Sequence, residues 1–174
     1  PVQEALPALE TWLDSGGPKD VLAIGPLTNL ALAYRSFPEK LQCLGTLTWM
    51  GASRARGNHT EHAEYNAFAD AEALATVLQH DAPLRIVDLE LCRQVTFGQA
   101  DMPILEDRLL ADLLGGYLDI ALSRGREQMT IYDPIAALAV VQPSLVQFER
   151  VNLTVHTENA VSYTHLRAHE TDYY

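Results

Sequence analysis

The 174-residue sequence lacks several features that mark large classes of protein. Its only cysteines, Cys43 and Cys92, fit no metal-binding or redox spacing, so each is expected to be a small buried side chain in a reducing compartment. No apolar run approaches the length that spans a membrane, and no basic and apolar leader opens the chain. These absences predict a cytoplasmic protein without a membrane partner.

Positive charge is scarce as well. The chain has 12 lysines and arginines against 23 aspartates and glutamates, which gives a net charge of −11. Binding to a nucleic-acid backbone needs a basic face, so nucleic acid is excluded as an expected partner. Hydrophobic residues make up 48% of the sequence, enough for one domain with a buried core.

The apolar residues that are present alternate between helical spacing and short continuous runs. Helices are predicted at 2–14, from Pro26, from Asp70, at 104–124 and from Asp133, and strands at 21–24, 46–50, 84–89 and 151–155. This alternation indicates an α/β fold, with a mostly parallel sheet covered by helices on both faces. Ligands bind beyond the carboxyl ends of such strands, which directs attention to Gly25, the loop after Met50 and the segment after Leu89.

Residues 57–66, which follow the second predicted strand, are unusually rich in Asn, Glu, His and Thr. Asn both donates and accepts hydrogen bonds, and Glu accepts them from hydroxyls, so the loop suits a vicinal diol or a sugar. The same composition is also typical of a solvated surface loop, which is the commoner case. His59 and His62 could suggest zinc, but no third ligand is evident, so exposed loop histidines are favoured.

Asp133 and Pro134 have two interpretations. Asp at a helix N-cap followed by Pro at the first helical position is favourable helix-starting chemistry. The Asp133 carboxylate could also bind a hard cation, but calcium takes several oxygen ligands, so this residue cannot form a site alone.

The last residues differ from the rest. Residues 161–171 are identical to a translation of a transposase adapter used in preparing sequencing libraries. Residues 161–174 are therefore expected to be an artefactual tail, and the spacing of His165 and His169 is given no weight as a metal pair.

Several segments together resemble the inosine–uridine-preferring nucleoside hydrolase family over nearly all of residues 1–160. The segments that carry the resemblance are 23–31, 49–51, 57–58, 63–66, 70–73, 132–136 and 142–144. The resemblance implies hydrolysis of the N-glycosidic bond of ribonucleosides to base and ribose, with calcium as cofactor and a homo-oligomeric full-length protein. In the family mechanism, calcium holds two ribose hydroxyls and a water that an aspartate deprotonates.

The resemblance also assigns roles to individual residues. Asn58, Glu64 and Asn66 would bind ribose hydroxyls, and Met50 would line the same pocket. Calcium would be held by the Asp133 carboxylate and by the main-chain carbonyl of Ile24. Tyr132 stands where many members have a histidine that helps the base to leave, so its hydroxyl or another acid would serve.

Two other departures from the family pattern limit the expectation. The family's amino-terminal aspartate cluster has no counterpart here, so residues 1–160 are expected to be an incomplete domain and the chain as printed is expected to be inactive. The turn at 90–92 replaces a more typical aspartate-containing turn, and the sequence assigns it no role. Two alternatives remain: a non-catalytic domain that binds ribose or a nucleoside with the same residues, and a structural α/β domain whose loop is only solvated.

Overall fold

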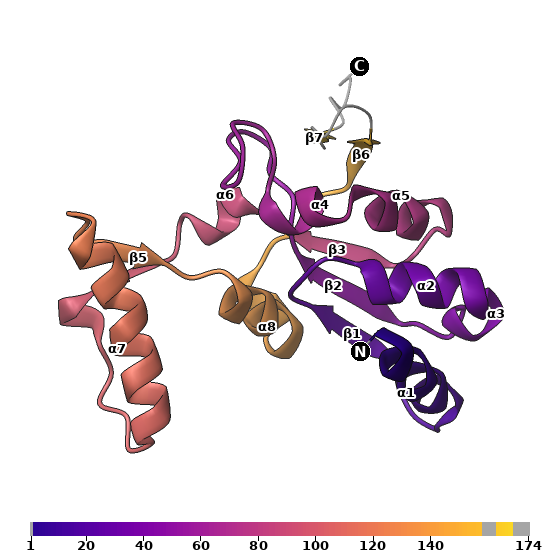
Figure 1. Ribbon diagram of the computed structural model, residues 1–174, viewed down its shortest axis with the longest axis horizontal. Helices are drawn as coiled ribbons and strands as arrows, with labels where there is room; N and C mark the ends of the chain where they lie inside the picture. The colour runs from indigo at the N-terminus through magenta and orange to yellow at the C-terminus, as the bar shows by residue number, and fades with distance from the viewer. Residues whose placement is uncertain (1, 158–162, 169–174) are drawn as a thin grey trace.

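A computed structural model describes residues 2–157 and 163–168. Its centre is a parallel sheet in the order β1-β2-β3, formed by β1 (Asp20–Ala23), β2 (Thr46–Met50) and β3 (Leu84–Val87). The three strands point the same way, so their carboxyl ends meet at one edge of the sheet (Figure 1). The prediction of an α/β fold with a parallel sheet is confirmed.

Helices cover both faces of this sheet. On one face lie α2 (Thr28–Ser36) and α5 (Ala71–Gln79), with α1 (Val2–Asp14) and α3 (Pro38–Leu41) packed beside α2. On the other face, α8 (Asp133–Val141) contacts all three strands. Successive side chains of a strand point to opposite faces. Accordingly, Leu47 and Trp49 of β2 pack in the cluster with α2 and α5, whereas Met50 packs with α8.

Two short helices follow the strand ends. These are α4 (Tyr65–Ala69), after the loop that leaves β2, and α6 (Leu89–Cys92), directly after β3. The sequence predicted a strand as far as Leu89, and this boundary was wrong. Asp88 ends the strand because its side chain accepts a 2.9 Å hydrogen bond from the backbone N–H of Leu91 and so caps α6.

A separate group of elements projects away from the sheet, and we call residues 96–130 the arm (Figure 1). It consists of β4 (Thr96–Gly98), the 3₁₀ turn η1 (Gln99–Asp101), α7 (Arg108–Ser123) and β5 (Gln128–Thr130), with β4 and β5 antiparallel. Its buried hydrophobic residues are Phe97, Leu118 and Ala121. α7 continues through the two glycines at 115–116, which the sequence suggested would loosen it.

The chain then passes from α8 through η2 (Pro143–Leu145) to an antiparallel hairpin of β6 (Val151–His156) and β7 (Tyr163–Ala168). β7 lies inside the predicted artefactual tail, while 161–162 and 169–174 lie outside the described residues. The pairing needs only main-chain N–H and C=O groups, which nearly every residue supplies, so it does not test the origin of the tail. Nowhere in 2–157 or 163–168 is a helix both long enough and apolar enough to cross a bilayer.

Candidate functional site

The residues predicted to form the site, apart from Asn58, lie at or beside the carboxyl edge of the sheet. Ile24 follows β1 directly and is 51% exposed, whereas Met50 is the buried last residue of β2. Asp133 begins α8, which packs against the same strands. The charge of Asp133 also contributes to the raised pKa of Glu64, so these two carboxylates are electrostatic neighbours.

Trp49 fixes the main chain at this edge. Its side chain is fully buried, and its indole N–H donates a 3.0 Å hydrogen bond to the carbonyl oxygen of Gly25. A Cβ at Gly51 would overlap the Trp49 ring, so only glycine fits after β2. The indole thus ties the ends of β1 and β2 together beside Ile24, whose carbonyl is a predicted metal ligand.

Glu64 occupies a position that its predicted ribose-binding role did not anticipate. It is 1% exposed and caps α4, accepting hydrogen bonds from the backbone N–H groups of Asn66 (2.9 Å) and Ala67 (3.1 Å). It also accepts one from Ala52 (3.1 Å), whose φ of +67° places it in the left-handed region. Both carboxylate oxygens are therefore engaged by main-chain donors that fix the start of α4 and the end of the β2 loop.

The pKa of Glu64 reflects this environment. Burial raises the pKa of its carboxyl, the three backbone hydrogen bonds lower it, and the nearby charge of Asp133 raises it further, with a net upward shift. Glu64 and Asp133 are therefore two electrostatically coupled carboxyl groups at this edge of the sheet.

Asn66 and Met50 form the floor next to Glu64. The Asn66 side-chain amide donates a 3.0 Å hydrogen bond to the carbonyl oxygen of Met50 and lies 3.7 Å from the Met50 sulfur. Since the nitrogen faces Met50, the side-chain oxygen of Asn66 remains as an acceptor, and no bond to that oxygen occurs within the described ranges. An acceptor in this position suits a ligand hydroxyl.

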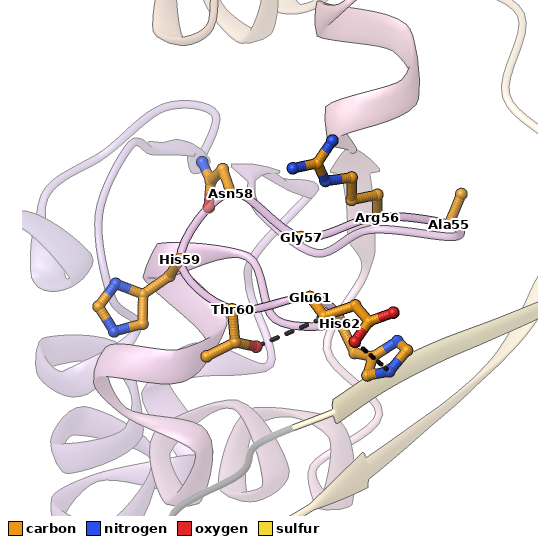
Figure 2. Close-up of a pocket in the computed structure, with 8 residues that line it drawn as sticks. All are labelled: Ala55, Arg56, Gly57, Asn58, His59, Thr60, Glu61 and His62. Carbon is orange, nitrogen blue, oxygen red and sulfur yellow. Dashed lines mark hydrogen bonds and ion pairs between the residues drawn. The ribbon is translucent and has the colours of Figure 1, made fainter.

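The loop above this floor is closed by its own main chain. The carbonyl oxygen of Ala63 accepts from three successive N–H groups, those of Asn58, His59 and Thr60, at 3.1 to 3.3 Å. A Cβ at Gly57 would overlap Ala63 and Thr60, so the turn requires glycine there. A hollow of about 590 Å³ is lined by residues 55–62 alone (Figure 2).

Of the predicted ribose-binding residues, only Asn58 lines this hollow. Its side-chain oxygen accepts a 2.9 Å hydrogen bond from Tyr65 N–H, which leaves its amide nitrogen free to donate elsewhere. The hollow therefore belongs to the loop, and Met50, Glu64 and Asn66 are not among its lining residues. His59 packs against Tyr65 and Phe68, and His62 lies beside Glu61.

The sequence suggested Asp133 as the N-cap of α8, and this was wrong. Tyr132 is the N-cap residue and Asp133 is the first helical residue, followed by Pro134. The Asp133 carboxylate is half-buried, and burial raises its pKa. Burial partly desolvates the carboxylate, and within the described residues it has no hydrogen-bond or ion-pair partner that would compensate its charge.

An uncompensated carboxylate fits one ligand position for a hard cation. It is a single ligand, however: the described residues contain no group of three His, Cys, Asp or Glu side chains that could hold a metal ion. Calcium prefers six to eight oxygens, so the donor set described here is partial.

Two neighbours of Asp133, Cys92 and Tyr117, were not foreseen from the sequence. Burial, together with the charges of Asp88, Asp133 and Glu64, raises the pKa of Cys92 to about 12, so this buried thiol is protonated and unreactive. Tyr117, from α7, donates a 3.0 Å hydrogen bond to the Thr130 carbonyl oxygen. Burial is the largest cause of the raised pKa of Tyr117, and the charges of Tyr132 and Asp133 raise this pKa further. Sequence spacing carried no signal for either contact, because both join segments distant in the chain.

Comparisons with known proteins identify the family. Residues 2–172 match the family described as inosine-uridine preferring nucleoside hydrolase. The chain is 34% identical over 155 residues to a probable uridine nucleosidase 2 of Oryza sativa subsp. japonica, covering 83% of this chain and 45% of the relative. It is 32% identical over 146 residues to the non-specific ribonucleoside hydrolase RihC of Escherichia coli, covering 81% and 47%.

The solved structures agree on the fold. A plant nucleoside hydrolase superposes with a TM-score of 0.79 at 20% identity, covering 99% of this chain and 56% of its own. The chain thus spans about half the length of the curated relatives it matches. The match runs through nearly every described element, and we conclude that the chain belongs to the inosine–uridine-preferring nucleoside hydrolase family.

Proposed function

We propose that the protein represented by this chain hydrolyses the N-glycosidic bond of ribonucleosides, releasing base and ribose. The observation that carries the proposal is the Asp133 carboxylate, half-buried beside Glu64 at the carboxyl edge of the sheet and without a hydrogen-bond or ion-pair partner among the described residues. Family membership and the names of the relatives support the reaction class. Charge of this kind is costly to maintain unless a ligand compensates it.

The chain's own residues suit the ribose side of the reaction. Asn66 presents a side-chain oxygen to accept from a sugar hydroxyl, and Asn58 can donate from the loop above. Met50 offers an apolar wall under the sugar. The half-buried Tyr132, next to Asp133, is the proposed proton donor to the leaving base, in the place of the histidine found in many members.

Calcium fits this donor set in part. Asp133 and the carbonyl oxygen of Ile24 would hold the ion, which would supply orientation of the ribose hydroxyls and activation of a water. Glu64 contributes negative potential rather than an available ligand atom, because main-chain donors engage both of its oxygens. We further propose that the 174-residue chain alone does not hydrolyse nucleosides, since one carboxylate and one carbonyl cannot hold calcium tightly.

The test compares two proteins. The chain as printed is assayed with uridine and inosine, and so is a longer reading frame that contains it. Turnover only by the longer protein, lost on adding a chelator, supports the proposal. A longer frame without an additional aspartate cluster, or turnover by the 174-residue chain itself, would overturn it.

A substitution separates the role of Asp133 from a general effect on folding. Asp133→Asn in the longer protein is expected to abolish measurable hydrolysis. Asp107→Asn, which keeps a good N-cap at the start of α7, should leave hydrolysis unchanged. Equal activity of both variants would contradict the role of Asp133.

A second candidate is a domain that binds ribose or a nucleoside without catalysis. The partial donor set favours it for this chain, since Asn58 and Asn66 need no metal to bind hydroxyls. Calorimetry with D-ribose distinguishes the two, because binding without turnover by the longer protein would establish the second. A homo-oligomeric full-length protein is also proposed, and analytical ultracentrifugation would test it.

A further inference from the structure

One acidic side chain of α6 holds the loop that leaves β2. The Glu90 carboxylate accepts hydrogen bonds from the backbone N–H groups of Arg54 at 2.6 Å and Ala55 at 3.3 Å. The Ser53 hydroxyl lies 2.9 Å from the same carboxylate and 2.8 Å from the Arg56 carbonyl oxygen, so its one proton is shared between them. Glu90 therefore contacts three consecutive residues of the loop.

A second side chain of the same segment reaches the loop farther along. The Arg93 guanidinium donates at 3.0 Å to Glu90 and, through its other terminal nitrogen, at 3.0 Å to the carbonyl oxygen of Gly57. The Glu90 side chain is only 21% exposed and that of Arg93 35%, so solvent screens this pair less than a surface ion pair. A further ion pair joins Arg54 to Asp88 at 2.6 Å.

Main-chain bonds close residues 57–63 on themselves, whereas residues 54–56 are held by the bonds to Glu90 and Asp88. Residues 54–56 are exposed, so no apolar burial fixes them against the body of the protein. Gly57, at the far end of the Arg93 bond, immediately precedes Asn58. A shift of the loop at Gly57 would move Asn58 relative to Asn66 and Met50.

We propose that Glu90, acting with Arg93, is a positioning residue that holds residues 53–57 so that Asn58 faces the ribose site. The inference rests on the proposed function, in which Asn58 binds a ribose hydroxyl. It assigns a role to the segment 90–92, for which the sequence suggested none. Glu90 itself touches no substrate in this scheme.

The first experiment measures, on the 174-residue chain, the bonds by which Glu90 and Arg93 hold residues 53–57. Glu90→Gln replaces one acceptor oxygen with a donor group facing other donors. Amide hydrogen exchange followed by NMR should speed up at Arg54 and Ala55 by roughly tenfold to a hundredfold, because charge-assisted bonds are lost. Glu127→Gln, at an exposed glutamate of the arm, is the matched control and should change no rate in this loop. Unchanged exchange at both amides in Glu90→Gln would overturn the proposal that Glu90 holds residues 53–57.

The second experiment relates these bonds to ribose binding. D-ribose is titrated while the Asn58 side-chain amide signal is followed in the parent chain and in Glu90→Gln, Arg93→Lys and Glu127→Gln. We expect weaker ribose affinity in Glu90→Gln and in Arg93→Lys than in the parent chain. Lys at position 93 can pair with Glu90 but cannot also reach the carbonyl oxygen of Gly57. The melting temperature should change little in both variants. Equal affinity in all four proteins would overturn the positioning role. Failure of every protein to bind ribose would contradict the proposed ribose site instead. The hydrogen-exchange experiment would still show whether Glu90 holds residues 53–57.

Discussion

At the scale of single residues, Glu64 shows how one side chain can be structural and still shape a site. It accepts three backbone hydrogen bonds at almost complete burial, and the charge of Asp133 helps to raise the pKa of its carboxyl. Sequence reasoning selected Glu64 for its oxygens but could not foresee the capping role, since Glu is not among the preferred N-cap residues. Its assignment to ribose binding stays a prediction.

Substitution of Glu64 tests that structural role. Glu64→Gln places an amide nitrogen against main-chain donors and should lower the free energy of unfolding by about 1–3 kcal/mol. Urea denaturation would measure it. Glu61→Gln, with a side chain 83% exposed, is the control and should stay within about 0.5 kcal/mol of the parent. A loss no larger than that of the control would contradict the capping role.

Asp133 provides a prediction on pH. Burial raises its folded pKa above the ordinary value of 3.8, so the folded chain holds this proton more tightly than the unfolded chain does. The favourable contribution is therefore complete below pH 3.8 and is lost as pH rises through the folded pKa. Asp133→Asn removes that loss, and we expect the metal-free variant to melt roughly 1–3 °C higher at pH 7.

Differential scanning calorimetry at pH 4 and pH 7 would check this expectation. The gain over the parent should be present at pH 7 and smaller at pH 4, where part of the Asp133 population is already protonated. Asp107→Asn, the exposed cap of α7, serves as control. A variant that is less stable than the parent at pH 7 would show that the carboxylate has a stabilising partner.

At the scale of elements, glycines at two positions differ in what they require. Gly51→Ala would force a methyl group into the buried Trp49 ring and should destabilise the chain by about 2 kcal/mol or more. Gly115→Ala meets nothing within 4 Å inside α7 and should stabilise it by about 0.5–1 kcal/mol. Thermal melts of the two variants should therefore shift in opposite directions, and shifts of the same sign would refute the packing described at β2.

The sequence predicted the elements with strong periodicity well. β2 has the bounds expected from its residues, and Asp70 caps α5 through the backbone N–H of Ala73 as expected. It did not predict β4 and β5, because strands of three residues carry no measurable alternation. The contacts of Glu90 were also out of reach, since they join a side chain to main-chain groups more than thirty residues away.

At the scale of the whole molecule, exposed apolar side chains gather on α7. Leu109, Leu110 and Leu113 are 55% to 66% exposed, and the spacing of Leu109 and Leu113 places them on one helical face. β1 and β3 each pair only with β2 among the described strands. Both features favour association between chains, against which the net charge of −11 acts by repulsion.

Sedimentation velocity at increasing concentration would test this expectation. We expect the parent chain to self-associate and Leu113→Lys to shift the distribution toward monomer. Leu145→Lys, at a residue of the same 61% exposure outside the arm, is the control and should have the smaller effect. Association that is equally strong in the parent and both variants would exclude α7 as a contributor.

The projection of the arm away from the sheet has a hydrodynamic consequence. A compact chain of 174 residues has an expected radius of gyration of about 16 Å. The square of that radius is the mean squared distance of the atoms from the centre of mass. Because α7 projects away from the sheet (Figure 1), its atoms increase the radius of gyration more than an equal number of atoms near the centre would. Small-angle X-ray scattering of the monomer should therefore give a radius above the compact value and a pair-distance distribution with an extended tail.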